Sequence, residues 1–440
     1  MVKSDRMLGF FIVLAGIYYA WSSYILPLRS DEAFFYLKSI GSSWQSIAPT
    51  GIMEYLIQGI NFFGDSSLNL RLLAIIFISF TLLIIYNITY SISDRTGAWF
   101  SMMMCFVSIP VSYAYISITP NGLFIFAGAL FIYGLFKIIT EEKNEIRYYI
   151  WVSFALLLLV TTDITGIIFV ILPFLYGALK KELFKNKAYV IMALSGIFWV
   201  VLFAVLHYFG LFSIFYKYPV YENDNMIFYY VMLLITYLPL IYVLFVYLNT
   251  RAVNNKIHFL FVSAVFLGIS YLIVSIIFHN DIRNAGAFLP ASIILTGYYF
   301  ESYKYKVLLG IFIIFTVFVS VYTTLAPKSP LTPKNMEYSK IYEFNRFGMQ
   351  EIIGLGELLF SYDEGFSSLL SYNILIRPEA CTLNDCSGSS GVFVSTKKED
   401  NLTDYFENVK ETRISRLISK EDGVLQLYCY SVSGLKTKKK

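Results

Sequence analysis

The first polar interruption of the sequence holds two adjacent carboxylates. Asp31 and Glu32 follow directly after the first long apolar segment, in the stretch RSDEAFFYLKSIG. A carboxylate at a membrane boundary with a second one beside it binds a proton more readily, through desolvation and like-charge repulsion, which suits a group that must remove a proton. Ser30 followed by two acids is also typical of a helix start, with the serine as N-cap. The pair is therefore either a candidate catalytic base or a capping signal.

Further polar residues interrupt the apolar sequence at wide intervals. Glu54 lies in an amphipathic stretch, Asp163 in LLLLVTTDITGIIFV, and His279 at the start of HNDIRNAGAFLP. Inside a membrane span a charge costs about 2.5 to 3.5 kcal/mol, so Asp163 is tolerable only at a helix end or beside a wet cavity. The Thr-Gly step that follows it predicts a helix end. Arg283 has the planar guanidinium fork that suits an anion such as a phosphate.

These residues belong to a chain with the composition of a membrane protein. Of its 440 residues, 57% are hydrophobic and 15% are charged, whereas soluble domains have about 25% charged residues. Apolar runs long enough to cross the membrane predict about eleven spans, near 8-28, 69-91, 98-118, 120-139, 148-162, 164-179, 188-208, 226-248, 258-278, 285-302 and 306-326. We therefore expect an all-α polytopic membrane domain over residues 1–326, with interfacial helices in a first outer loop at 29–68.

Lysine and arginine are distributed unevenly over the connecting loops. If the N-terminus is cytoplasmic, the loops on that side hold most of the cations, as the positive-inside rule requires. The first apolar run lacks a small-residue cleavage site and is kept as a span. This topology puts most of the other polar residues on or near the outer face, namely Asp31, Glu32, Glu54, Asn121, Asp163, His279, Asp281 and Arg283. The net charge of +4 is too small to imply a nucleic-acid partner.

The composition changes near Ala326 to that of an ordinary globular domain. Residues 327–440 are expected to form a small extracytoplasmic α/β cap domain, with a strand from Gly391, a helix over 401–410 and a hairpin around the Asp-Gly step at 422–423. Cys381 and Cys386 flank a short loop that a disulfide would close, a question that the sequence leaves open. No Cys/His spacing suits a zinc site.

The order of several motifs resembles that of a known class of membrane enzyme. DEAFFYLKSIG followed by APTGIMEYLIQGINFFGDSSLNLRLLA is similar to the first outer loop of the GT-C glycosyltransferases. The likeness is to the polyprenyl-phosphate-sugar-dependent group, which includes protein O-mannosyltransferases and aminoarabinose transferases. SITPNGLFIFAGALFIYGLF and HNDIRNAGAFLPASIIL resemble two further segments of that family. The resemblance implies the same layout of spans and outer domain, an inverting sugar transfer, and Asp31 as the base.

Three positions depart from the family's pattern. The aspartate of the family's Arg-Pro-Asp motif is Asn121 here, and Asp163 stands where many members have a lysine near the end of the fifth span. The basic residue often found in the Pro-containing turn is missing from residues 48–51. The acidic pair is unaffected, so the departures concern the identity of the sugar and the grip on the lipid phosphate.

The expected reaction fixes the roles of the candidate residues. Transfer of a sugar from a lipid-linked phosphate needs a base for the acceptor hydroxyl and positive or dipolar groups for the departing phosphate. We assign the first role to Asp31, with Glu32 beside it, and the second to Arg283. The other candidates for substrate binding are Asn121, Glu54, Asp163 and His279.

The expected partners follow from the same reaction. They are a polyprenyl-phosphate sugar donor, a lipid, glycan or protein acceptor, and the membrane lipids, with no nucleic acid. The sequence defines no cofactor and leaves a divalent cation open. The sugar and the acceptor are not encoded in any motif that we recognise.

Plainer interpretations compete at each position. Arg283 and His279 also suit the anchoring of a span at the interface, and Glu54 suits the solvated face of an amphipathic helix. Asp163 is equally suited to capping a helix end. For the whole chain, a non-catalytic scaffold or binding protein of the same fold and a lipid or solute transporter are the alternatives. A transporter would more often show internal repeats or paired broken helices, which the sequence lacks.

Overall fold

The computed structural model describes the greater part of the helical half of the chain and the strands near its end. The described residues are 6–25, 56–57, 59, 67–108, 110–111, 119–140, 145–209, 226–250, 254–278, 282–301, 310, 358–361, 379–382, 390–395, 402–419 and 423–435. The expected last span at 306–326, the domain boundary at 326 and the possible Cys381–Cys386 bridge fall wholly or partly outside them.

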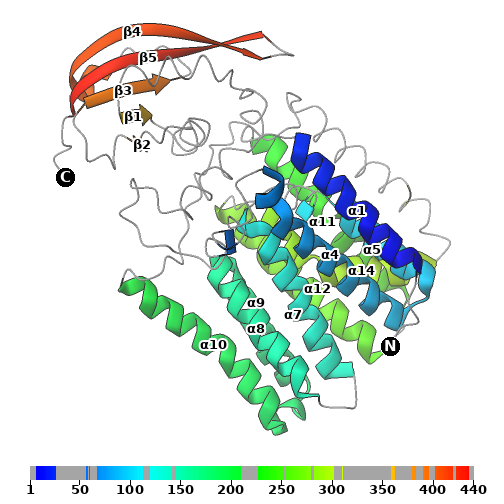
Figure 1. The fold of residues 1–440 in the computed structure, drawn as a ribbon. Coiled ribbons are helices and arrows are strands. Elements are labelled where there is room, and N and C mark those ends of the chain that lie inside the picture. Colours follow the sequence, from blue (N-terminus) through cyan, green and yellow to red (C-terminus); the bar gives the residue numbers. More distant parts are fainter. Residues whose placement is uncertain are drawn as a thin grey trace.

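The first three hundred residues form a helical body, as the sequence predicts (Figure 1). Its main helices are α1 (Arg6–Ile25), α4 (Ser67–Ile92), α5 (Arg95–Val107), α7 (Pro120–Thr140), α8 (Ile146–Thr162), α9 (Ile167–Leu179), α10 (Lys187–Tyr208), α11 (Met226–Thr250) and α12 (Asn255–Phe278). Of the described helices, 4 are long and apolar enough to cross a membrane, at Arg71–Ile92, Pro120–Thr140, Lys187–Tyr208 and Asn255–Ile277. The membrane character of the chain is confirmed, and the number of spans stays a prediction.

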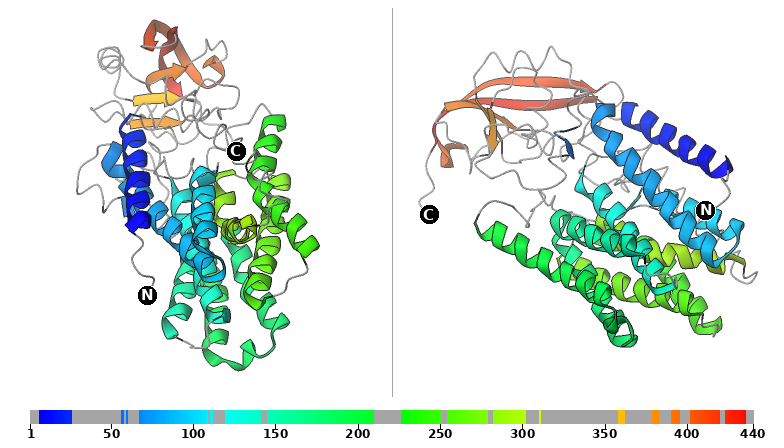
Figure 2. Two further views of the ribbon diagram at one scale, coloured as in Figure 1. Left: turned by 90° about the vertical axis from the view of Figure 1, so that its right-hand side faces the viewer. Right: turned by 60° about the horizontal axis from the view of Figure 1, so that its bottom comes forward.

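Helix α7 is the most enclosed of these spans. It packs against α4, α8 and α12, and 72% of its span is buried, compared with 28% for α10. Figures 1 and 2 show α10 at the edge of the helical body, and several of its large apolar side chains are exposed, among them Ile191 and Phe198. A polar residue on α7 therefore lies inside the protein and requires hydrogen-bond partners there.

Prolines interrupt two of the expected spans. The span expected at 98-118 is wrong as a single helix, because α5 ends at Val107 and Ser108 is extended, with φ −64° and ψ 136°. Pro110 lacks an N–H, and its ring would clash with the carbonyl of residue 106 in a continuous helix. The span expected at 285-302 is divided at Pro290 into α13 (Ala285–Phe288) and α14 (Pro290–Tyr298), although Leu289 between them keeps helical angles, with φ −94° and ψ −12°.

The C-terminal strands form one mixed sheet in the order β2-β1-β3-β5-β4. The strands are β1 (Leu358–Ser361), β2 (Glu379–Thr382), β3 (Ser390–Ser395), β4 (Phe406–Ser419) and β5 (Gly423–Leu435). Strand β1 is parallel to β2 and β3, whereas β5 is antiparallel to β3 and β4. The expected strand from Gly391 and the hairpin before Gly423 are confirmed, since Ser419 pairs with Gly423 across the turn.

The helix expected at 401–410 is wrong. Residues Leu402–Asp404 form one 3-10 turn, η5, and β4 begins at Phe406. The Phe406 side chain is buried and its ring lies 6.5 Å from that of Phe393 on β3. Cross-strand pairing with β5 and this aromatic contact outweigh the local preference of the segment, which is the usual way in which tertiary packing decides a strand.

The sheet and the helical body are arranged as separate layers. In Figures 1 and 2 all five strands lie on one side of the helices. Helix α1 starts at the end that points away from the sheet, and its last turn lies nearer to the strands (Figure 2). The N-terminus and the sheet are thus at opposite ends of α1.

Candidate functional site

Asp163 lies at the junction of two helices, as the sequence predicts. Helix α8 ends at Thr162, and Asp163 is extended, with φ −150° and ψ 143°. Its side chain caps the 3-10 turn η1 (Ile164–Gly166): Oδ1 accepts a hydrogen bond from the Thr165 backbone N–H at 2.8 Å and one from the Thr165 hydroxyl at 2.5 Å. The carboxylate is partly exposed, whereas Thr165 is buried. These donors compensate the cost of removing part of the carboxylate from water.

The second oxygen of this carboxylate begins a chain of side-chain hydrogen bonds. Asn284 Nδ2 donates to Asp163 Oδ2 at 2.8 Å, and Asn284 Oδ1 accepts from Asn121 Nδ2 at 2.6 Å. Asn284 ends the 3-10 turn η3 (Ile282–Asn284), and Asn121 lies in the first turn of α7. The chain Asp163–Asn284–Asn121, called the relay below, therefore joins three separate elements of the helical body.

The direction of the relay follows from the chemistry of its first member. An ionised carboxylate only accepts hydrogen bonds, so Asn284 must turn its amide nitrogen toward Asp163 and its oxygen toward Asn121. Asn121 must then present its nitrogen to Asn284, which leaves its own oxygen pointing elsewhere. In the described part of the chain, Asn121 Oδ1 has no hydrogen-bond partner. Asn121 is 0% exposed and Asn284 is 3% exposed.

Arg283 precedes Asn284 in the same turn and is 8% exposed. A guanidinium stays protonated in proteins and carries five N–H donors. A buried arginine therefore brings a fixed positive charge into a region of low dielectric constant, where a phosphate is attracted more strongly than in water. The relay fixes the position of the residue next to this charge.

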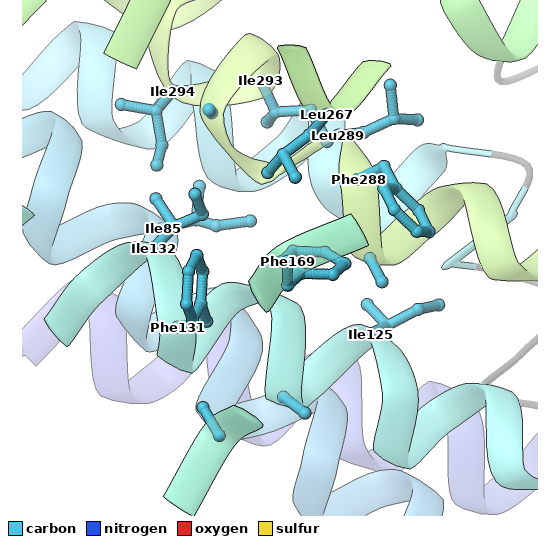
Figure 3. Close-up of a cluster of buried hydrophobic side chains, with 14 of the residues drawn as sticks. Ile85, Ile125, Phe131, Ile132, Phe169, Leu267, Phe288, Leu289, Ile293 and Ile294 are labelled. Atoms are coloured by element: carbon cyan, nitrogen blue, oxygen red, sulfur yellow. The ribbon is translucent and has the colours of Figure 1, made fainter. Parts of the chain in front are cut away.

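Aromatic contacts join α7 to the helices that follow Asp163 and Asn284 in the chain. Phe124 of α7 lies 6.3 Å from Phe169 of α9 and 5.8 Å from Phe288 of α13, between ring centroids, and Phe169 and Phe288 are 4.7 Å apart. Figure 3 shows Phe169 and Phe288 side by side, with Ile125 close to them. The helix that supplies Asn121 and the helices that follow Asp163 and Asn284 thus share one aromatic cluster.

Glycines allow the backbones of α7 and α13 to approach closely. A Cβ atom on Gly128 would lie 2.9 Å from the Cα of Ala287, and one on Gly286 would lie 2.6 Å from Cδ1 of Ile125. Real Cβ atoms do not approach so closely, so Gly128 is required against the fixed backbone of Ala287, whereas a Cβ at Gly286 would displace the terminal methyl of Ile125. The close approach brings α7 and α13 near enough for the short side chains of Asn121 and Asn284 to meet.

The structure brings together part of the predicted site. Asn121 and Asp163 are joined through Asn284, and Arg283 is adjacent in the chain. Asp31, Glu32, Glu54 and His279 lie outside the described residues, so their predicted roles are untested. Within the described ranges there is no group of three or more His, Cys, Asp or Glu residues that would hold a metal ion.

Two buried polar residues of the helical body are not among the candidates from the sequence. Asn284 stands in the quoted segment HNDIRNAGAFLP, where its position after Arg283 and before an apolar run was the available signal. Arg71 is 0% exposed near the start of α4. In the sequence it stands only within a quoted motif, although a charge in an apolar segment is a reason to expect a functional or paired group.

Two of the positions that differ from the GT-C pattern are connected in the structure through Asn284. Asn121 and Asp163, two of the positions at which the sequence differs from the pattern it resembles, are the two ends of the relay. A change at one end of a hydrogen-bonded chain alters what the other end must offer.

The helical body and the layered sheet define a polytopic membrane protein with the fold of the GT-C glycosyltransferases. No family model and no curated protein sequence matches the chain. A solved structure of ArnT from Cupriavidus metallidurans bound to undecaprenyl phosphate aligns with a TM-score of 0.61 at 11% identity, over 98% of each chain.

Two larger proteins share the fold over part of their length. The arabinofuranosyltransferase AftD from Mycobacteria aligns with a TM-score of 0.56 at 10% identity, over 99% of this chain and 40% of AftD. The oligosaccharyltransferase AglB from Archaeoglobus fulgidus, in complex with an inhibitory peptide and a dolichol-phosphate, aligns with a TM-score of 0.50 at 10% identity, over 88% of this chain and 66% of AglB. The resemblance drawn from the sequence motifs is confirmed at the level of the fold.

Proposed function

We propose that the chain is an integral-membrane glycosyltransferase that moves a sugar from a polyprenyl-phosphate-linked donor to an acceptor on the outer face of the membrane. The observation that carries this proposal is the alignment with ArnT from C. metallidurans along nearly the whole of both chains, in a structure that holds undecaprenyl phosphate. A fold alone does not define a function. The local support is a buried arginine next to a hydrogen-bonded relay that begins at a partly exposed carboxylate.

The proposed reaction is a single displacement. The acceptor hydroxyl oxygen forms a bond to the anomeric carbon of the sugar, and the bond from that carbon to the phosphate oxygen breaks. The bonding electrons leave with the lipid phosphate, and the hydroxyl proton passes to Asp31, the proposed base. Attack opposite the leaving phosphate inverts the anomeric centre. Arg283 stabilises the charge that develops on the phosphate.

The other candidates take supporting roles in this scheme. Glu32 stands beside the base, and Glu54 and His279 belong to the substrate-binding set. Asp163, whose carboxylate is partly exposed, is assigned to contact with the substrate. Asn121 is fully buried, so its contribution to substrate binding passes through Asn284.

We further propose that the N-terminus is cytoplasmic and that residues 327–440 form an extracytoplasmic α/β cap above the membrane domain of residues 1–326. The distribution of lysine and arginine supports this orientation. The position of the sheet, at the opposite end of α1 from the N-terminus (Figure 2), is consistent with it. Lipid, glycan and protein acceptors all remain within the proposal.

Transfer assays in membranes test the proposed function. Membranes that contain the wild-type protein, Asp31→Asn or Arg283→Ala are supplied with labelled polyprenyl-phosphate sugars, and transfer of label to endogenous acceptors is followed. Glu182→Gln and Lys185→Ala are the matched controls, because both residues are exposed and lie in or next to the short turn η2 (Leu183–Lys185). We expect transfer by the wild type and by both controls, and its loss in Asp31→Asn and Arg283→Ala.

The outcomes separate the parts of the proposal. Full activity of Asp31→Asn would exclude this carboxylate as the base while leaving the enzyme class intact. If the wild type transfers no sugar from any donor, the chain is better described as a non-catalytic scaffold or binding protein of the same fold.

A further inference from the structure

In the function proposed above, Asn284 only connects Asn121 to Asp163, yet it occupies the centre of the relay. Both polar atoms of its side-chain amide are used: the nitrogen donates to Asp163 and the oxygen accepts from Asn121. It is nearly completely buried and follows Arg283 in the turn η3. No other residue type of this size offers a donor and an acceptor in this arrangement except an amide.

We propose that Asn284 is a positioning residue for the transfer reaction: it transmits the hydrogen-bond direction set by Asp163 to Asn121 and fixes the turn that carries Arg283. The catalytic use of this positioning rests on the proposed function, since Arg283 is assigned there to the departing phosphate. The relay itself rests only on the geometry of the three side chains.

The Thr165 donors make the direction of the relay predictable in variants. The Thr165 backbone N–H always donates, so residue 163 must keep an oxygen facing it. In Asp163→Asn the new amide nitrogen therefore faces Asn284. Asn284 must then turn over to present its oxygen, and Asn121 must turn over in response. A single change at residue 163 thus reverses two buried amides.

The opposite change creates a different conflict. In Asn284→Asp the new carboxylate still accepts from Asn121, but it faces the Asp163 carboxylate over the distance now spanned by a hydrogen bond of 2.8 Å. Two acceptors of like charge at this separation repel each other. The turn with Arg283 must move away from Asp163 or lose its alignment.

The double variant Asp163→Asn/Asn284→Asp removes both conflicts. The amide of residue 163 keeps its oxygen on Thr165 and donates its nitrogen to the carboxylate of residue 284. That carboxylate also accepts from Asn121, whose amide keeps its original direction. The net charge, the side-chain volumes and the number of hydrogen bonds are those of the wild type. The double variant therefore tests the donor–acceptor direction of the hydrogen bonds and not the volume of the side chains.

The experiment compares the wild type, both single variants and the double variant in the transfer assay with a labelled polyprenyl-phosphate sugar. Misplacement of a group that acts in the transition state can cost about 100-fold in rate, so we expect each single variant to lose kcat by roughly that factor with little change in KM. We expect the double variant to recover at least about tenfold relative to either single variant, as coupled neighbours do in a double-mutant cycle. Equal activity of Asn284→Asp and wild type, or a double variant no better than the single ones, would overturn the proposal.

A second measurement separates this inference from the proposed function. The thermal unfolding midpoints of the same four proteins, purified in detergent, form a double-mutant cycle that requires no substrate. Coupling between positions 163 and 284 together with an inactive wild type would contradict the proposed function but leave the relay intact. Additive midpoints in an active enzyme would contradict the relay and leave the function intact. Asn408→Asp on the exposed face of β4 is the control for an amide-to-acid change.

Discussion

Asn284 donates a hydrogen bond to Asp163 across 121 residues of sequence, from Nδ2 to Oδ2 at 2.8 Å. The contact joins the end of α8 to the turn before α13, and through Asn121 it extends to α7. Asp163 is the charged member of this chain and sets its direction. The carboxylate is consequently more than a helix cap, because its second oxygen determines how two buried amides lie.

Removal of the Thr165 hydroxyl tests how firmly Asp163 is held. Thr165→Val keeps the side-chain shape and the backbone N–H donor but removes the hydroxyl that donates to Oδ1. Loss of a hydrogen bond to a charged group costs about 1.5 to 3 kcal/mol of folding stability, so we expect a lower thermal unfolding midpoint in detergent. Thr162→Val is the control, since its hydroxyl donates to the Leu158 carbonyl of its own helix. Equal losses in the two variants would show that the hydroxyl of Thr165 has no special role.

A methyl group between α7 and α13 tests the close approach that the relay requires. In Gly128→Ala the added Cβ would meet the backbone of Ala287, which has no freedom to rotate away. Such overpacking costs about 1 to 3 kcal/mol, and we expect a lower thermal midpoint together with reduced transfer. In Gly16→Ala, on the outer helix α1, the nearest atom lies at 3.8 Å. This control is expected to behave like the wild type, and a Gly128→Ala protein of unchanged stability would contradict the packing described.

The sequence contains enough information for the helical architecture but not for the contacts between helices. Long apolar runs predict helices such as α4, α7 and α10 to within a few residues, because crossing a membrane leaves the backbone few other options. The helix boundary at Pro290 follows from the residue type, since proline removes a helical hydrogen bond. In contrast, residues 401–410 become a turn and a strand because of pairing with β5, which is a distant segment.

The sequence likewise predicts some residues of the candidate site but not the contacts between them. Asp163 at a helix end was predictable from the cost of a charge within a span and from the break that follows. Its partner Asn284 was not, because a hydrogen bond between residues this far apart depends on how α7, α8 and α13 pack. Asn121 and Asp163 were recognised separately as departures from a family pattern. Only the packing shows that they belong to one chain of hydrogen bonds.

The aromatic cluster around Phe288 is expected to stabilise the helical body that carries the site. Phe288 is completely buried and contacts Phe124, Phe169 and Tyr271, the last at 4.3 Å between ring centroids. Truncation of a buried phenylalanine to alanine costs about 3 to 5 kcal/mol through lost contacts and a cavity. Phe288→Ala should therefore lower the thermal midpoint in detergent clearly. Phe154→Ala, at a side chain that is 48% exposed, should lower it less, and equal effects would contradict the assignment of Phe288 to the core.

The orientation of the chain in the membrane gives the last prediction. The turn between α9 and α10 contains Lys180, Lys181 and Lys185, and the positive-inside rule places such a turn in the cytoplasm. Two reporters read this directly: alkaline phosphatase is active only outside the cytoplasm, and green fluorescent protein exported in the unfolded state fluoresces only inside. We expect fluorescence from a fusion after Lys181 and phosphatase activity from a fusion after Lys440. The reverse pattern would place the sheet in the cytoplasm and would rule out transfer on the outer face beneath a cap formed by residues 327–440.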